Sequence, residues 1–319
     1  MSTTLGPREG VGVKTVRPPH RSGKRRRSPM RVHWAMYLFP LPAVALSVVF
    51  FFLPLLQSFQ YALTDWNGYS PSFNYVGFDN FVKALTGDSL FTNALENNLK
   101  FLIVVVVVQT FFALLLALLL VRNTRGSVVL RALFFFPAIL SSIAVGFIWK
   151  FVYDPSFGMA NTTLEKVGLG SLQGSYLGDP GSAMVWVAIV QVWFHAGQLM
   201  TVFIAGLQLI PRELYEAAEL DGAGRWQQFK SVTWPMIAPA TAIVVAYTTI
   251  QCFMAFDLIL GMVGNPPSNA QDILSTRIYS TFANSAYGYA AAQSIIFMLL
   301  IGIVVVVQRR MLRLTQKDT

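Results

Sequence analysis

Six apolar runs, each close to the length that crosses a lipid bilayer as a helix, set the strongest limit on how this chain can fold. About 20 residues of α-helix span the hydrocarbon core, because each residue rises about 1.5 Å. The runs lie near residues 34–57, 101–121, 132–149, 183–209, 236–256 and 290–308. A backbone in lipid must satisfy its own hydrogen bonds. The pattern therefore predicts an all-α integral membrane protein with six transmembrane helices.

Composition independently indicates a membrane protein. Hydrophobic residues make up 54% of the chain and charged residues only 12%, with a mean hydropathy of +0.53. Ordinary soluble domains carry about 25% charged residues. This excess of hydrophobic over charged residues excludes an ordinary soluble domain, and lipid is the expected solvent.

The distribution of Lys and Arg predicts which ends face the cytoplasm. Residues 1–33, the turn at 122–131, the loop at 212–230 and the C-terminal tail hold nine, three, three and four cations, which is 19 of the 24. The other five lie in the opposite set of loops, at Lys83, Lys100, Lys150, Lys166 and Arg277. Because cytoplasmic loops carry an excess of cations, both termini and loop 212–230 are predicted to be cytoplasmic.

The first 33 residues are predicted to be a disordered, basic cytoplasmic tail, because they are rich in Pro, Gly, Ser and Arg. The run at 24–27 has a pattern that also occurs in nucleic-acid-binding and nuclear-targeting segments. Directly before a membrane span, we interpret it as an orientation anchor attracted to anionic lipid. No cleavable signal peptide is expected, since the first apolar run is too long and begins too late.

The sequence contains no recognisable catalytic or metal-binding pattern. The single cysteine, Cys252, excludes an intramolecular disulfide. The only Gly-Lys pair, Gly23–Lys24, is not followed by Ser or Thr, so a Walker A loop is missing. The three histidines are too far apart to indicate a metal site; they are His20, His33 and His195. We therefore expect a protein that is not an enzyme, binds no cofactor or metal and does not hydrolyse ATP by that route.

A charged, glycine-broken segment at residues 213–239, here called the interfacial segment, separates two of the apolar runs. Pro211 suits the first turn of a short helix, and glutamates at 213, 216 and 219 form an acidic edge. Gly222 and Gly224 then break the helical period, and a second short stretch begins at Arg225. The pattern fits an ordinary amphipathic linker at the membrane surface, and it fits equally a segment that holds a partner.

The interfacial segment resembles the EAA-type cytoplasmic loop in the permease subunits of binding-protein-dependent ABC importers. The family pattern reads roughly EAAxxDGAxxxxxFxxIxLPxxxP. The matching residues are Glu216, Ala217, Ala218, Asp221, Gly222, Ala223, Phe229, Val232, Pro235 and Pro239, with Val232 in place of isoleucine and Trp234 in place of leucine. Three pieces resemble the carbohydrate-uptake branch, of the maltose and glycerol-phosphate permease type; they are AGLQLIPRELYEAAELDGA at 205–223, FDLILGMVGNPP at 256–267 and TDWNG at 64–68. The similarity runs from about Trp34 to the end.

The resemblance implies a type I ABC importer permease in a bacterial cytoplasmic membrane, with a permease domain at 34–315, an EAA loop at 211–235 and a tail at 316–319. It also implies that residues 216–220 dock on a separate ATPase, which uses ATP and Mg. The implied partners are a second permease subunit in a heterodimer, two copies of the ABC ATPase, an extracytoplasmic solute-binding protein and membrane lipid, without nucleic acid. The ATPase-coupling residues that it implies are Glu216, Ala217, Ala218, Asp221, Gly222, Ala223, Phe229 and Pro235.

Polar residues in and beside the fourth and fifth spans are candidates for the substrate path. They are Gln191, His195, Gln198, Tyr247, Gln251 and Asp257. The first three share one helical face, the next two lie one turn apart, and the last lies near the outer end of the fifth span. Unpaired polar groups are costly in hydrocarbon, so this face is expected to line a wet cavity or the bundle interior. The alternatives are that the stripe joins neighbouring helices and that Asp257 holds a loop.

The scarcity of charge in the spans favours a neutral cargo. No Lys or Arg lies in the inner two-thirds of any span, and these side chains are the usual partners of phosphate and carboxylate. We therefore expect a carbohydrate, either a di- or an oligosaccharide. The resemblance leaves glycerol phosphate or another small polar solute as an alternative. An ion-coupled secondary transporter is a further alternative, which the lack of a charged relay disfavours.

The outer loops, residues 58–100, 150–182 and 257–289, are long for simple connectors. A helix-like apolar face comes from Phe78, Phe81, Val82 and Leu85. These loops are expected either to pack at the membrane interface or to contact the solute-binding protein.

Overall fold

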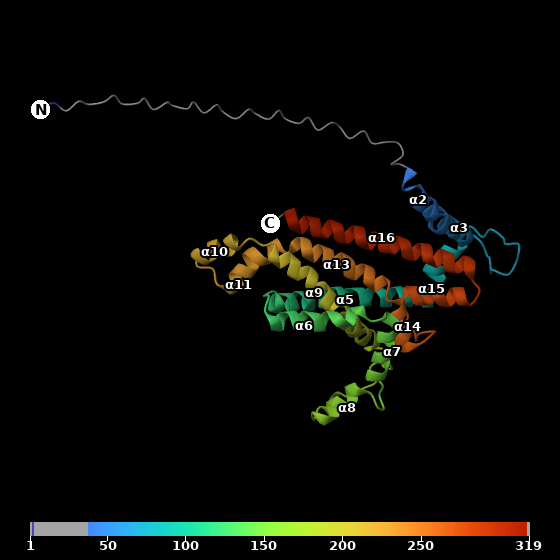
Figure 1. The fold of residues 1–319 in the computed structure, drawn as a ribbon. Helices are drawn as coiled ribbons and strands as arrows, with labels where there is room; N and C mark the ends of the chain where they lie inside the picture. Colours follow the sequence, from blue (N-terminus) through green and yellow to red (C-terminus); the bar gives the residue numbers. More distant parts are fainter. Residues whose placement is uncertain (1, 3–37, 318–319) are drawn as a thin grey trace. The chain divides into compact units, whose positions relative to one another are not determined.

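The computed structural model describes Ser2 and residues 38–317, with side chains described up to Arg310 (Figure 1). The chain divides into two compact units, Met1–Phe52 and Leu53–Thr319. The predictions for the basic tail, for the first residues of the first span and for residues 318–319 lie outside the described residues.

All regular structure in the described part of the chain is helical, apart from one isolated antiparallel bridge between Thr64 and Tyr75. The first unit contains α2 (Leu41–Ser47) and a π-helical turn (Val48–Phe52). The longer helices of the second unit are α3 (Leu53–Ala62), α5 (Ser89–Leu120), α6 (Arg125–Phe135), α7 (Ser142–Val152), α9 (Ala183–Gln208), α13 (Ala238–Phe253) and α16 (Tyr287–Lys317). Its shorter helices are α4 (Asp79–Val82), α8 (Met159–Lys166), α10 (Arg212–Leu220), α11 (Arg225–Gln228), α12 (Trp234–Met236), α14 (Phe256–Val263) and α15 (Leu274–Ala283).

Four helical stretches are long and apolar enough to cross a membrane, and the count rises to six if each of two bent pairs forms one span. The four stretches are Leu41–Ala62, Ser89–Leu120, Ala183–Gln208 and Tyr287–Arg310. The bent pairs are Arg125–Ile139 with Ser142–Val152, at 101°, and Arg225–Met236 with Ala238–Phe253, at 63°. The third run, predicted as a single span at 132–149, is therefore broken by a bend, whereas the second bend lies at the start of the fifth run, predicted at 236–256.

Both bends occur beside proline. Pro137 lies in a 3-10 turn after α6, and extended backbone at Leu140 and Ser141 separates that turn from α7. The break before α13 falls at Ile237, and Pro239 lies in the first turn of that helix. Proline lacks an N–H and cannot donate a helical hydrogen bond, so a helix is interrupted beside it at a lower cost.

Two other predicted boundaries are also corrected, and the last helix continues into the predicted C-terminal tail. Helix α5 begins at Ser89 and not near residue 101, because the Asp88 carboxylate caps it by accepting hydrogen bonds from the N–H groups of Leu90 and Phe91, both at 3.0 Å. The first helical stretch continues to Ala62, beyond the predicted end at 57. Helix α16 extends through residues 316–317, which the sequence assigned to a tail.

The core forms where α9 packs on α5, α13 and α14, and where α7 crosses α14. Its largest fully buried side chains include Phe101, Phe203 and Met262. The α7–α14 crossing depends on glycine: a Cβ on Gly146 would lie 2.6 Å from the carbonyl oxygen of Leu258. Small residues allow helix backbones to approach this closely in membrane proteins.

The second unit has two distinct ends (Figure 1). Helices α10 and α11, the turn between α5 and α6 and the C-terminal end of α16 share one end, and α14 and α15 lie toward the other. Three of the four cation-rich segments thus lie together, as the charge distribution requires. The outer loops contain short helices of their own, so they are folded structures and not extended connectors.

Candidate functional site

The interfacial segment is built around a glycine-terminated helix. Gly222 has a φ of +80°, and its N–H donates to the carbonyl of Glu219 at 3.0 Å. The N–H of Ala223 donates to the carbonyl of Ala218 at 2.9 Å. These two bonds form a Schellman motif, which satisfies carbonyls that the end of α10 would otherwise leave unpaired. The turn predicted from the sequence is present, with α11 starting at Arg225 as expected.

The outer side of this segment is not covered by the described chain. Glu216, Ala217, Asp221 and Gly222 are exposed, while the other four predicted coupling residues are half-buried. Two large apolar side chains are also uncovered, with Leu220 90% and Trp226 74% exposed. An apolar patch beside an acidic edge is typical of a surface that meets another protein.

The inner side of the segment is attached to the membrane helices. The hydroxyls of Tyr215 on α10 and Thr233, just before α12, are hydrogen-bonded at 2.9 Å. Phe229 stacks on Trp226 with ring centroids 5.6 Å apart and contacts Trp234 at 6.3 Å. Helix α10 is therefore joined through α11 and α12 to the start of α13.

Three of the six predicted path residues form one polar cluster. Tyr247 on α13 accepts hydrogen bonds from Nε2 of Gln198 on α9 at 3.0 Å and from Nε2 of Gln251 at 2.9 Å. Gln198 and Gln251 are half-buried and Tyr247 is 37% exposed, so this chain leaves one side of the cluster uncovered. The cluster offers an O–H donor and two amide oxygens to a ligand.

The other predicted path residues lie elsewhere. Gln191 and His195 are buried within the helix bundle, at 2% and 8% exposure. Nδ1 of His195 lies 3.4 Å from the carbonyl oxygen of Gln191, one turn earlier in the same helix. Asp257 is exposed in the first turn of α14, where a carboxylate is stabilised by the positive helix end. The stripe on α9 is therefore divided between a buried pair and the open Gln198.

Two glutamines that the sequence interpretation passed over, the buried Gln109 and the half-buried Gln308, join the long helices. Nε2 of Gln109 on α5 donates to Thr248 Oγ1 at 3.3 Å, and Nε2 of Gln308 on α16 donates to Thr249 Oγ1 at 2.6 Å. Thr248 and Thr249, which are neighbours on α13, thus link this helix to α5 and to α16. A glutamine inside an apolar run is the signal that could have identified both.

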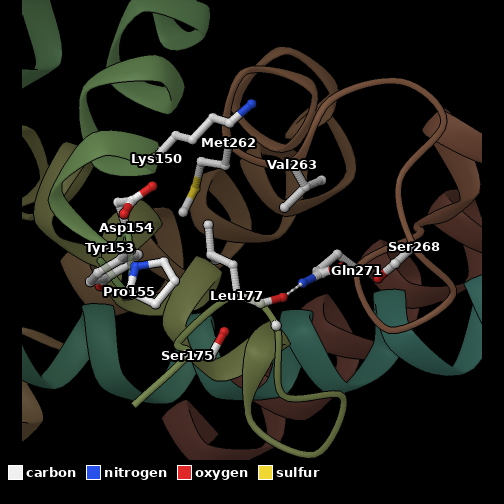
Figure 2. A pocket seen from close by; sticks show the side chains of 11 residues that line it. Lys150, Tyr153, Asp154, Pro155, Ser175, Leu177, Met262, Val263, Ser268 and Gln271 are labelled. Atoms are coloured by element: carbon white, nitrogen blue, oxygen red, sulfur yellow. Dashed lines mark hydrogen bonds between the residues drawn. The ribbon is translucent and has the colours of Figure 1, made fainter. Parts of the chain in front are cut away.

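A pocket of about 390 Å³, lined by both polar and apolar side chains, lies between the end of α7, the end of α14 and the loop before α15 (Figure 2). Lys150 and Asp154 come from the end of α7 and the following turn, and Gln271 comes from the loop before α15. Nε2 of Gln271 donates to the carbonyl of Leu177, which fixes two loops to each other (Figure 2). No group of His, Cys, Asp and Glu within residues 38–317 is arranged to hold a metal ion.

Residues 109–315 match the family described as "Binding-protein-dependent transport system inner membrane component". The chain belongs to this family. It is therefore a multi-pass permease component in a cell membrane, part of an ABC transport system and not itself an enzyme.

Curated relatives support this membership over most of the chain. The permease is 34% identical to the diacetylchitobiose uptake system permease protein NgcF of Streptomyces coelicolor, over 88% of this chain and 83% of the relative. It is 33% identical to the multiple sugar-binding transport system permease protein MsmF of Streptococcus mutans, over 86% of this chain and 93% of the relative. It is 30% identical to the sn-glycerol-3-phosphate transport system permease protein UgpA of Agrobacterium fabrum, over 83% of this chain and 90% of the relative.

Solved structures match the whole permease fold. A bacterial ABC transporter that imports the acidic polysaccharide alginate has a TM-score of 0.75 and 25% identity, covering 88% of this chain and 95% of that one. The same kind of transporter, solved with an alginate pentasaccharide-bound periplasmic protein, has a TM-score of 0.76. The all-α fold of an ABC importer permease, predicted from the sequence, is thereby confirmed.

Proposed function

We propose that this chain is one of two permease subunits in an ATP-driven importer that carries a neutral di- or oligosaccharide into the cytoplasm. The observation that carries the proposal is the interfacial segment, whose uncovered outer side is joined through Tyr215 and Thr233 to the helices beyond it. The sugar cargo is supported by the names of NgcF and MsmF and by the neutral Gln198–Tyr247–Gln251 cluster.

In this proposal the outer side of α10 docks in a groove on an ABC ATPase. Leu220 and Trp226 supply apolar contact, and Glu216 supplies charge at the edge. Two ATPase subunits, which bind ATP and Mg, close together and move the two permease loops. Because α10 is joined to α13 through short packed helices, the movement changes which side of the membrane the central cavity faces.

The Gln198–Tyr247–Gln251 cluster is the part of the path that we expect to contact the sugar. Tyr247 already accepts two amide hydrogen bonds, so its O–H proton remains free to donate. The amide oxygens can accept from sugar hydroxyls. The full assembly that we propose has a second, related permease, two ATPase subunits and an extracytoplasmic solute-binding protein that delivers the cargo.

Glycerol phosphate is the second candidate cargo, because the chain is 30% identical to UgpA. A phosphate is bound most strongly by Arg or Lys, and neither occurs among the six proposed path residues. The neutral cluster therefore favours a sugar.

The test is uptake by the complete complex, with its binding protein, in proteoliposomes. We expect ATP-dependent uptake of maltose or N,N′-diacetylchitobiose, and stimulation of ATP hydrolysis by the same sugar. Uptake of sn-glycerol-3-phosphate alone would replace the sugar assignment. Uptake that follows an ion gradient and needs no ATP would contradict the importer mechanism itself.

A further inference from the structure

A second pocket, of about 580 Å³, is lined by other residues than the polar cluster on α9 and α13. It is formed by α3, the loop that follows α3, the start of α14, α15 and the first turns of α16. Six aromatic side chains line it, namely Tyr61, Trp66, Phe256, Tyr279, Phe282 and Tyr287. Its volume is within the range of about 300–1,000 Å³ that is usual for small-molecule sites.

The TDWNG piece at residues 64–68 forms one wall of this pocket. Trp66 stacks on Tyr61 with ring centroids 4.3 Å apart, and its carbonyl accepts a hydrogen bond from the N–H of Gly288 at 2.9 Å. Gly68 has a φ of +79°, and a Cβ there would lie 2.2 Å from the ring of Tyr287. Only glycine suits both this conformation and this close approach. The piece thus places two aromatic rings, Trp66 and Tyr287, at fixed positions.

The polar groups of the pocket are neutral. The lining residues include Gln57, Ser58, Ser275 and Ser294, and none of them is Asp, Glu, Lys, Arg or His. Among the described residues, Ser275 Oγ is buried without a hydrogen-bond partner. A buried hydroxyl without a partner is unfavourable, so a ligand that supplies one would be stabilised there.

We propose that this aromatic pocket is a second carbohydrate subsite, which holds a neutral sugar ring before it reaches the Gln198–Tyr247–Gln251 cluster. The proposal rests on the proposed function only in taking a sugar as the cargo. A sugar ring has an apolar C–H face that stacks on aromatic rings and a rim of hydroxyls that bonds serine and amide groups. Trp66 supplies the first kind of contact and Ser275 the second.

The same features disfavour a lipid occupant. A phospholipid headgroup would bring a phosphate into a pocket without a cationic side chain. An acyl chain would leave the Ser275 hydroxyl and the Gln57 amide facing hydrocarbon.

Binding is measured directly by saturation-transfer NMR on the purified transport complex without its binding protein, with maltose and N,N′-diacetylchitobiose as probes. We expect Trp66→Ala to weaken binding about five- to tenfold, because it removes a stacking partner, and Trp66→Phe to restore most of it. Ser275→Ala, which is a small change in packing, should weaken binding about threefold. Tyr69→Ala is the matched control, because Tyr69 is exposed, lies in the same loop and is not among the lining residues.

Sugar signals that weaken in Trp66→Ala and Ser275→Ala and are retained in Tyr69→Ala, with equal amounts of assembled complex, would support the subsite. Signals that are unchanged in Trp66→Ala and Ser275→Ala, or absent in the parental complex, would overturn it, as would a copurified lipid that Trp66→Ala releases. If the parental complex imports only sn-glycerol-3-phosphate, the proposed function fails, and the binding measurement still decides the subsite.

Discussion

Tyr247 connects two helices through a single hydroxyl. It accepts from Gln198 on α9 and from Gln251 on its own helix, so it fixes the orientation of both amides. The sequence placed Tyr247 and Gln251 one turn apart but gave no indication that Gln198, 49 residues earlier, would meet them. Helical periodicity determines which residues share a face of one helix, whereas helix packing decides which faces meet.

The substitution Tyr247→Phe tests this cluster. It keeps the ring and removes the oxygen, which leaves two amides without their shared partner. We expect the sugar KM for uptake to rise about tenfold, since hydrogen bonds of this kind contribute about 0.5–1.5 kcal/mol each. The KM is measured from the kinetics of ATP-driven sugar uptake in proteoliposomes. An unchanged KM would exclude the cluster from the path.

Gly222 is required for its backbone conformation. Its φ is +80° and a Cβ would meet nothing within 4 Å, so alanine would add strain of about 1–2 kcal/mol without a clash. We expect Gly222→Ala, combined with Glu216→Ala, to abolish most transport while the permease remains inserted and assembled. Gly222→Asn is the matched control for conformation, because asparagine tolerates this region. A double variant that transports at the parental rate would contradict the coupling role.

Among the helices, α5 shows how an outer-loop carboxylate extends a span. Asp88 caps α5 and accepts a hydrogen bond from the Tyr289 hydroxyl of α16 at 2.7 Å. Burial acts to raise the pKa of Asp88, but the hydrogen bonds from Tyr289, Phe91 and Leu90, together with the charge of Arg277, outweigh it and hold the pKa below its ordinary value. The ionised carboxylate is thus the form that ties α5 to α16.

This pairing predicts an acid-sensitive contribution to stability. A carboxylate with a lowered pKa stabilises the fold above its unfolded-state pKa of about 3.9, and the contribution is lost as pH falls through the folded value. We expect the thermal stability of detergent-purified permease to fall more steeply between about pH 5 and pH 3 than that of Asp88→Asn. Asparagine still caps a helix and does not titrate, so equal slopes would contradict the assignment.

For the whole molecule, the charge distribution and the fold agree on which segments share an end. The only cysteine, Cys252, is fully buried, so introduced cysteines can be labelled selectively. In cells that express the permease without its ATPase, we expect Leu220→Cys to react with a membrane-impermeant maleimide only after the membrane is opened, and Phe157→Cys to react in intact cells. Both side chains are well exposed. The reverse labelling pattern would contradict the predicted topology.

The membrane class, the helical fold and the interfacial segment follow from the sequence itself, because lipid imposes local requirements: about 20 apolar residues for each span, and charge only at the ends. The bends at Pro137 and Ile237, the separation of His195 from Gln198 and the aromatic pocket around Trp66 required the tertiary structure. The separation of the two α9 side chains and the aromatic pocket depend on contacts between residues that are distant in the chain. Such contacts are fixed by how the helices pack, and periodicity along one helix carries no information about the helix that lies beside it.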